Sequence, residues 1–200
     1  MIAIIDYGAG NLHSVQNALA ALGEQTVITN KPGEILGADK VILPGVGAFA
    51  DAMDKLCKTG MDQVVHQLVE MQKPLLGICL GMQLFFEKSE EAPGVKGLGV
   101  LKGNIVRIPP AEGLKIPHMG WNSLLDLRGK LLNGLGSEPY VYFVHSYYLE
   151  AEDQAAVSAY TQYGKRLAIA IEQGNLFATQ FHPEKSGTVG MQILKNFLSL

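Results

Sequence analysis

The chain has few of the features that mark several large classes of protein. It contains only two cysteines in 200 residues, and Cys57 and Cys79 lie too far apart to form a CxxC motif. Free thiols are therefore favoured over a disulfide bridge. The N-terminal apolar stretch ends at Ile5, because Asp6 follows, so no signal-peptide core is predicted and the expected compartment is the cytoplasm.

Long apolar runs and an excess of charge are also lacking. No run approaches the length of a membrane-spanning helix, and a net charge of −3 with both signs scattered along the chain predicts no surface for nucleic acid or an acidic membrane. Small-molecule chemistry remains as the expectation. Nearly half of the residues (48%) are hydrophobic, and the length predicts a single domain, residues 1–200, with a buried core.

The most informative stretch is residues 74–86, which read Pro-Leu-Leu-Gly-Ile-Cys-Leu-Gly-Met-Gln-Leu-Phe-Phe. The pattern predicts a strand, a tight Gly-x-Cys-x-Gly corner and then a helix from Met82. The two glycines would let the backbone turn sharply and hold Cys79 at the tip, as the nucleophile elbow of hydrolases holds serine. A thiol at a helix start also faces unpaired N–H groups, which favour the thiolate. A cysteine that only fills space is the alternative, and Cys57 is given that role.

The first half of the chain predicts an open, mostly parallel α/β sheet flanked by helices. Short continuous apolar runs, typical of strands covered on both faces, alternate with apolar residues at helical spacing. The predicted strands are residues 2–5, 25–28, 41–43 and 75–78, and the predicted helices begin at Leu12, Phe49 and Met61. Ligands of such sheets bind beyond the carboxyl ends of the strands, where Cys79 stands.

The second half is predicted to be rich in strands and to belong to the same domain. Glycine and proline recur between residues 93 and 113 and interrupt short β-prone pieces. The predicted strands are residues 104–108, 140–144, 155–160, 167–171 and 176–180, and a closing helix covers residues 189–197, with Ser186 available to cap it.

A cysteine nucleophile needs a base for proton transfer and a group that orients this base. His182 directly follows a predicted strand in the sequence Phe-His-Pro-Glu, which brings its imidazole near the carboxylate of Glu184. The alternative is that His182 and Glu184 form an ordinary surface pair, which the Gly-x-Cys-x-Gly corner at residues 77–81 makes less favoured. A metal site of Cys79, His182 and Glu184 is a competing hypothesis, but no conventional fourth ligand is evident, so no metal is expected.

Acyl chemistry also needs N–H donors for an oxyanion, and two sources are predicted. One is the N–H of Leu80, and the other is the loop of Gly45, Val46 and Gly47 after the neighbouring strand. This loop also fits the GxGxxA form of a dinucleotide fingerprint, but it follows the third strand and lacks the acidic residue expected about twenty positions on. Backbone donors are the preferred interpretation, and no cofactor is expected.

Together these stretches resemble the class I, triad-type glutamine amidotransferases. The resemblance is carried by Gly-Ile-Cys-Leu-Gly-Met-Gln at residues 77–83, Phe-His-Pro-Glu at 181–184 and Pro-Gly-Val-Gly at 44–47. Within that class, Asp-Tyr-Gly-Ala-Gly-Asn at residues 6–11, Pro-His-Met-Gly-Trp-Asn at 117–122 and Tyr-Phe-Val-His-Ser-Tyr at 142–147 are similar to the glutaminase subunits of imidazole glycerol phosphate synthases. The match covers essentially the whole chain.

The resemblance implies a reaction at three side chains. Cys79 would attack the side-chain amide of glutamine, His182 would move the protons, and Glu184 would orient His182. A glutamyl thioester would form and be hydrolysed to glutamate and ammonia.

The resemblance also implies how glutamine is held. Gln83 and Glu91 would bind its α-amino group, and backbone amides of Ser146 and Tyr147 would bind its carboxylate. Without the resemblance, Gln83 would be interpreted as a solvated helix residue and Glu91 as part of an ordinary acidic loop.

A partner follows from the same resemblance, because no residues remain to use the ammonia. A (β/α)8-barrel cyclase subunit, joined in a heterodimer, would take the ammonia and make imidazole glycerol phosphate and aminoimidazole carboxamide ribotide. Asn11, Trp121, Asn122 and Lys185 are expected on the shared face, although the residue type alone would place Trp121 in the core. The alternatives are the glutaminase subunit of another synthase, such as anthranilate synthase, and a non-catalytic regulatory subunit of the same fold.

Overall fold

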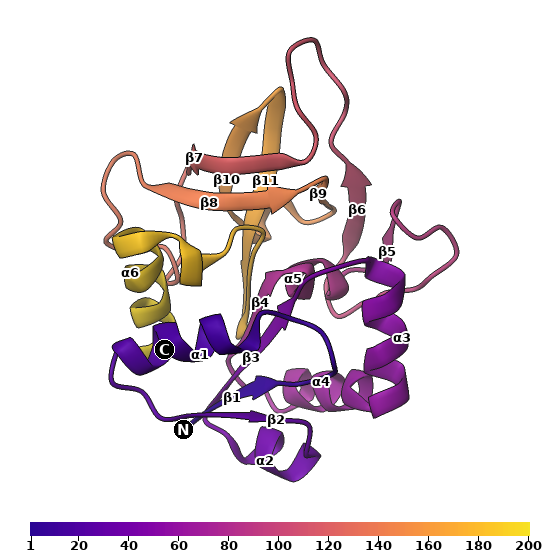
Figure 1. Cartoon of the computed structure of the whole chain (residues 1–200), viewed down its shortest axis with the longest axis vertical. Helices are drawn as coiled ribbons and strands as arrows, with labels where there is room; N and C mark the ends of the chain where they lie inside the picture. The colour runs from indigo at the N-terminus through magenta and orange to yellow at the C-terminus, as the bar shows by residue number, and fades with distance from the viewer.

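A computed structural model describes all 200 residues (Figure 1). The strands are β1 (Ile2–Ile5), β2 (Thr26–Thr29), β3 (Lys40–Gly45), β4 (Leu75–Cys79), β5 (Lys88–Ser89), β6 (Gly103–Arg107), β7 (His118–Ser123), β8 (Tyr140–His145), β9 (Tyr147–Ala151), β10 (Val157–Tyr163), β11 (Lys165–Gln173) and β12 (Leu176–Thr179). The helices are α1 (Leu12–Ala21), α2 (Pro32–Gly37), α3 (Phe49–Thr59), α4 (Met61–Glu70), α5 (Leu80–Leu84) and α6 (Gly187–Leu198), with short 3₁₀ turns η1 (Gln154–Ala156) and η2 (Pro183–Lys185).

Ten strands form one mixed sheet in the order β2-β1-β3-β4-β12-β11-β9-β6-β5, with β10 paired to β11. The strands from β2 to β12 in this order are parallel, whereas β11 runs antiparallel to β12, β10 and β9, and β9 runs antiparallel to β6. β7 and β8 form a separate antiparallel ribbon. The α/β prediction, with parallel strands first and a β-rich second half, is confirmed.

Helices cover both faces of the parallel strands because successive strand residues point to opposite sides. Ile2 and Ile4 belong to one apolar cluster, which α1 and α6 complete, whereas Ala3 and Ile5 belong to a second cluster with residues of α2, α3 and α4. Figure 1 shows α1 and α6 together on one side of the sheet and α3 and α4 on the other. This packing fixes the strand ends that carry the candidate site.

Four elements, α2, β5, β7 and β9, were not predicted from the sequence. α2 contains Gly33 and Gly37, which are poor helix formers, and only Ile35 of this helix is buried. β7 lacks a regular apolar alternation, β5 has only two residues, and β9 follows β8 after only Ser146, beyond the end of the strand predicted at residues 140–144. The predicted cap of α6 is also wrong, since the Ser186 hydroxyl donates to a backbone oxygen outside the helix instead of capping it.

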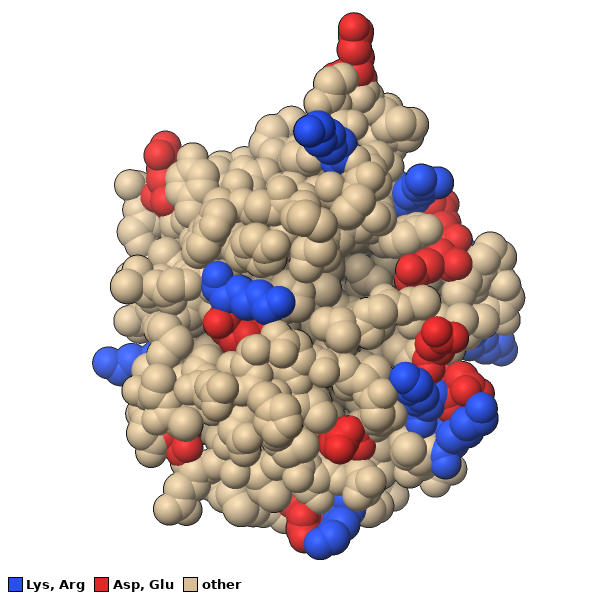
Figure 2. Space-filling model, viewed as in Figure 1, with Lys and Arg blue, Asp and Glu red and all other residues tan.

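The surface carries its charges in mixed patches (Figure 2). In the view of Figure 2, the region over β7 and β8 is almost free of charged side chains. This ribbon exposes Met119, Trp121 and Tyr140, which are 63%, 56% and 51% exposed, so Trp121 does not take the place in the core that its residue type alone would suggest. None of the helices has both the length and the apolar character needed to cross a membrane.

Candidate active site

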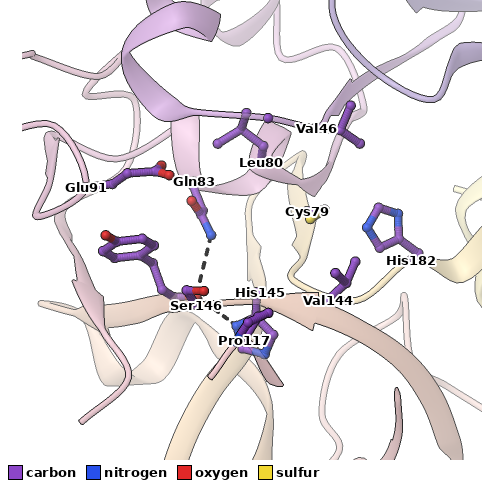
Figure 3. A pocket seen from close by; sticks show the side chains of 12 residues that line it. Val46, Cys79, Leu80, Gln83, Glu91, Pro117, Val144, His145, Ser146 and His182 are labelled. Carbon is purple, nitrogen blue, oxygen red and sulfur yellow. Dashed lines mark hydrogen bonds between the residues drawn. The ribbon is translucent and has the colours of Figure 1, made fainter. Parts of the chain in front are cut away.

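A pocket opens at the carboxyl ends of the parallel strands β3, β4 and β12, where ligands of an open α/β sheet are expected. Its volume is about 290 Å³, and it is lined by Val46, Gly47, Cys79, Leu80, Gln83, Glu91, Pro117, Val144, His145, Ser146, Tyr147 and His182. Figure 3 shows Val46 and His182 on one side of the Cys79 sulfur and Glu91 at the opposite end. Segments far apart in the sequence therefore meet in one cavity.

Cys79 ends β4 at a corner whose backbone is strained. Its φ of 56° and ψ of −111° lie outside the regions that a residue with a side chain ordinarily adopts. Gly77 and Gly81 have no positive φ, so the prediction that these glycines make the turn is wrong. The cysteine itself makes the turn, as the nucleophile does in the strained elbow of hydrolases.

The two glycines are required for space. A Cβ on Gly81 would lie 1.9 Å from the carbonyl oxygen of Leu43, and a Cβ on Gly77 would lie 2.7 Å from the ring of Phe85. Their absence of side chains lets β3, β4 and α5 approach closely and holds Cys79, 8% exposed, against the pocket. Since α5 has only five residues, the predicted help from a helix dipole is small.

His182 and Glu184 follow β12, the strand next to β4. His182 Nδ1 lies 2.8 Å from Glu184 Oε1, and the two side chains are 2% and 1% exposed. The main chain holds this pair in place, because the N–H of His182 donates to the Tyr142 carbonyl and the His182 carbonyl accepts from the Ser186 hydroxyl. The second ring nitrogen, Nε2, has no hydrogen-bond partner in the protein.

The imidazole of His182 favours its protonated form. Burial lowers its pKa, but interactions with the Cys79 sulfur and the Glu184 carboxylate outweigh burial and raise the pKa to about 10. An imidazolium beside a cysteine favours the thiolate, which is the reactive form of the side chain. The geometry therefore suits nucleophilic chemistry with proton transfer by His182.

Three of the four residues expected to supply backbone donors lie at the pocket beside Cys79. Val46, Gly47 and Leu80 line the pocket, and the φ of 97° at Gly47 lies in the region that glycine adopts freely. Gly45 does not line the pocket. It ends β3 where a Cβ would lie 2.6 Å from the backbone nitrogen of Gly81, so its place is to let the two strand ends meet.

Tyr7 contacts the residue directly before the same loop. Its side chain is 1% exposed, and its hydroxyl donates to the carbonyl of Pro44 at 3.1 Å, directly before Gly45. Burial and the negative charge of Cys79 raise the pKa of Tyr7, so the hydroxyl keeps its proton. The contact between Tyr7 and Pro44 was not predicted, because a tyrosine directly after a strand is usually a core residue. Its only distinguishing signal in the sequence is its place in the Asp-Tyr-Gly-Ala-Gly-Asn stretch at residues 6–11.

The residues expected to hold glutamine lie at the other end of the pocket. Glu91 Oε2 accepts from the backbone N–H of Phe49 at 2.9 Å, which places this carboxylate at the first turn of α3. Gln83 is 5% exposed, so the interpretation as a solvated helix residue is wrong. Ser146, between β8 and β9, and Tyr147, the first residue of β9, complete this end.

A buried pair of histidines, not predicted as part of the site, supports Tyr147. His145 Nδ1 lies 2.8 Å from the Tyr147 carbonyl, and His145 Nε2 lies 3.0 Å from His118 Nδ1. Because a carbonyl only accepts, His145 Nδ1 carries the proton and His145 Nε2 accepts from His118. Burial lowers the pKa of His145 to about 3 and that of His118 to about 4, so both rings are neutral at pH 7.

The four residues expected at a partner face lie outside the pocket. Trp121 and Lys185 are exposed, and the Trp121 ring comes within 3.9 Å of the position that a Cβ on Gly187 would occupy, two residues from Lys185. Asn122 donates to the Gln162 carbonyl at 3.0 Å, and Asn11 precedes α1 without capping it. Trp121 and the turn that carries Lys185 therefore share one region of the surface.

Cys57 differs from its expected role as filler. Its side chain is exposed on α3, and partial burial and the carboxylate of Asp62 raise the pKa of this thiol. Cys57 does not line the pocket. No three His, Cys, Asp or Glu side chains cluster closely enough to hold a metal ion.

Comparisons with known proteins agree with this geometry. Residues 3–200 match the family described as glutamine amidotransferase class-I. The imidazole glycerol phosphate synthase subunit HisH of Moorella thermoacetica is 51% identical over 98% of this chain and 93% of its own, and that of Methanocaldococcus jannaschii is 47% identical over 100% of both. A crystal structure of a glutamine amidotransferase shares the fold, with a TM-score of 0.78 at 23% identity over 100% of this chain and 98% of that one. The chain therefore belongs to the class I glutamine amidotransferases.

Proposed function

We propose that this chain is the glutaminase subunit of an imidazole glycerol phosphate synthase, and that residues 1–200 form its single domain. The proposal rests on a strained cysteine that shares its pocket with a buried His182–Glu184 pair. The names of the relatives identify the synthase, since HisH proteins are 47% to 51% identical to this chain. The chain acts on glutamine and supplies ammonia.

The reaction begins when the Cys79 thiolate adds to the side-chain amide carbon of glutamine. The carbonyl oxygen takes up the negative charge, and the N–H of Leu80 and the loop at Val46 and Gly47 stabilise it. His182 gives its proton to the amide nitrogen, the C–N bond breaks, and ammonia leaves. The product on the enzyme is a glutamyl thioester.

Hydrolysis then restores the enzyme. Neutral His182 takes a proton from water, the resulting hydroxide adds to the thioester carbon, and the C–S bond breaks to release glutamate and the thiolate. Glu184 holds the imidazole by its Nδ1 hydrogen bond and stabilises the imidazolium formed in this step. Every step is carried by groups of this chain and water.

The ammonia passes to a (β/α)8-barrel cyclase subunit in a cytoplasmic heterodimer, which completes the lyase reaction. The apolar, weakly charged ribbon of β7 and β8 supports a partner on this side, because exposed Met119, Trp121 and Tyr140 suit burial in an interface. Lys185 joins this face through its turn next to Trp121. Asn11 and Asn122 belong to the same proposed interface.

Covalent labelling tests the proposal. The γ-diazoketone analogue of glutamine should modify Cys79 and leave Cys57 free, as read by peptide mass spectrometry. Cys79→Ser should abolish glutamine-dependent synthesis in the complex and preserve synthesis from added ammonia, whereas Cys57→Ser should preserve both. Labelling confined to Cys57 would contradict the proposed chemistry.

A further inference from the structure

Gln180 is a fully buried polar side chain without a role in the reaction described so far. It directly follows β12, two residues before His182, and is 0% exposed. Its backbone N–H donates to the carbonyl of Ile169 at 2.8 Å, which fixes its position against β11. A buried amide must find partners for both of its ends.

The partners of this amide are both residues of the candidate site. Gln180 Oε1 accepts from Gln83 Nε2 at 2.9 Å, and Gln180 Nε2 donates to Cys79 Sγ at 3.7 Å. One side chain therefore connects the proposed nucleophile to a proposed substrate-binding residue. The pocket contains Cys79 and Gln83, whereas Gln180 lies behind them.

The contacts allow only one orientation of the two amides. Gln83 Nε2 also donates to the Tyr147 carbonyl at 3.5 Å, and a carbonyl can only accept. Gln83 must therefore direct its NH₂ group away from the substrate, so Gln180 must present its oxygen to Gln83. The NH₂ group of Gln180 is then left for the Cys79 sulfur, which suits a thiolate.

The orientation of the Gln83 amide determines which of its atoms faces the substrate glutamine. With both N–H bonds of Gln83 used by Gln180 and Tyr147, its Oε1 is the free end of the amide, and no protein group donates to it. An oxygen attracts the α-ammonium group of an amino acid, whereas an NH₂ group in its place would repel it.

We propose that Gln180 is a positioning residue of the glutaminase reaction, which orients Gln83 to accept from the substrate ammonium group and directs a donor to the Cys79 sulfur. The inference rests on the proposed function. It predicts that Gln180 acts on substrate recognition through Gln83, and that a change at either residue removes the same interaction.

The experiment compares two electrophiles that react with Cys79. The γ-diazoketone of glutamine carries the α-ammonium group, whereas iodoacetamide does not, so the ratio of their labelling rates isolates recognition of that group. Gln180→Met, an unbranched apolar replacement, should lower this ratio about 10-fold or more, the size expected for a hydrogen bond to a charged group. Gln83→Met should lower it equally, and the double variant should lower it no further.

The controls separate this role from a general loss of packing. Thr179→Val removes a buried hydroxyl that donates to the Phe181 carbonyl and makes no hydrogen bond with Cys79 or Gln83, so it should keep the wild-type ratio. If Gln180→Met does not fold, Gln180→Asn keeps the amide but draws it out of reach, and the same fall is expected.

The role of Gln180 and the proposed function would be contradicted by different results. An unchanged ratio in a folded Gln180 variant, or effects of Gln83 and Gln180 that simply add, would overturn the role of Gln180 alone. Absence of diazoketone labelling at Cys79 in the wild-type chain would instead contradict the proposed function.

Discussion

The buried histidine His145 should make the stability of this protein fall in mild acid. Its pKa is about 3 in the folded chain and about 6.5 when unfolded, so between these values the unfolded state binds the additional proton. The stability is therefore complete above about pH 6.5 and is lost as the pH falls below it. At pH 5 this one group costs about 2 kcal/mol relative to pH 7, from about 1.5 pH units at 1.36 kcal/mol each.

Replacement of the ring tests this number. His145→Gln keeps a neutral side chain that can donate to the Tyr147 carbonyl but removes the titration. Urea unfolding of the wild type and the variant at pH 7 and pH 5, at one ionic strength, should show that the loss between the two pH values is smaller by about 2 kcal/mol in the variant. The constant cost of the substitution cancels from this difference.

The control is His66→Gln on the exposed face of α4, which should retain the wild-type pH dependence. His118, whose pKa is also lowered, remains in both chains and contributes to each. His182 works in the opposite direction, because its raised pKa adds stability below about pH 6.5 that is lost as the pH rises towards 10. If the His145→Gln chain lost as much stability as the wild type on acidification, burial would not be what keeps this ring neutral.

Three further predictions concern the corner, the proton relay and the partner. Gly81→Ala should destabilise the chain by about 3 kcal/mol or more, because its Cβ would meet a backbone oxygen, whereas Gly37→Ala, with open space around it, should be neutral or stabilising; urea unfolding of both decides. His182→Ala should abolish glutaminase turnover, Glu184→Gln should reduce it less, and the double variant should match His182→Ala; fully additive losses would mean that the two residues do not act as a unit. We expect the partner to stimulate hydrolysis by this chain across the proposed interface; Lys185→Ala should reduce this stimulation but leave hydrolysis by the isolated chain unchanged, and equal effects on both rates would mean that Lys185 does not transmit it.

Much of the fold was predictable because its signals are local. The apolar runs of β1, β3 and β4 and the helical spacing in α1, α3 and α4 report burial on both faces of a sheet. The corner at Cys79 and the His182–Glu184 pair also stand out, since short motifs place these side chains at strand ends. Their meeting depends on β12 pairing with β4, which no local pattern encodes.

The remaining parts of the site depend on packing between distant segments. Gln180 is an ordinary polar residue at the end of a predicted strand, and only its contacts with Cys79 and Gln83 distinguish it. The glycines around Cys79 suggested a sharp turn made by the glycines themselves, but the structure needs them for close approach, a difference that depends on Leu43 in another strand. The sequence likewise shows a histidine at position 145 but does not predict its contact with His118.

The position of β12 has a consequence for how the protein is made. It is the last strand to be synthesised, yet it lies between β4 and β11 in the middle of the sheet. The strands on its two sides leave the ribosome earlier and cannot be joined until it arrives, which makes this a fold of long-range pairings. The segment that joins them also delivers His182, so a nascent chain acquires its general base as its sheet closes. A chain that stopped before β12 would leave β4, which carries Cys79, as an exposed edge strand that is prone to aggregation. Because it would also lack His182, it could not hydrolyse glutamine.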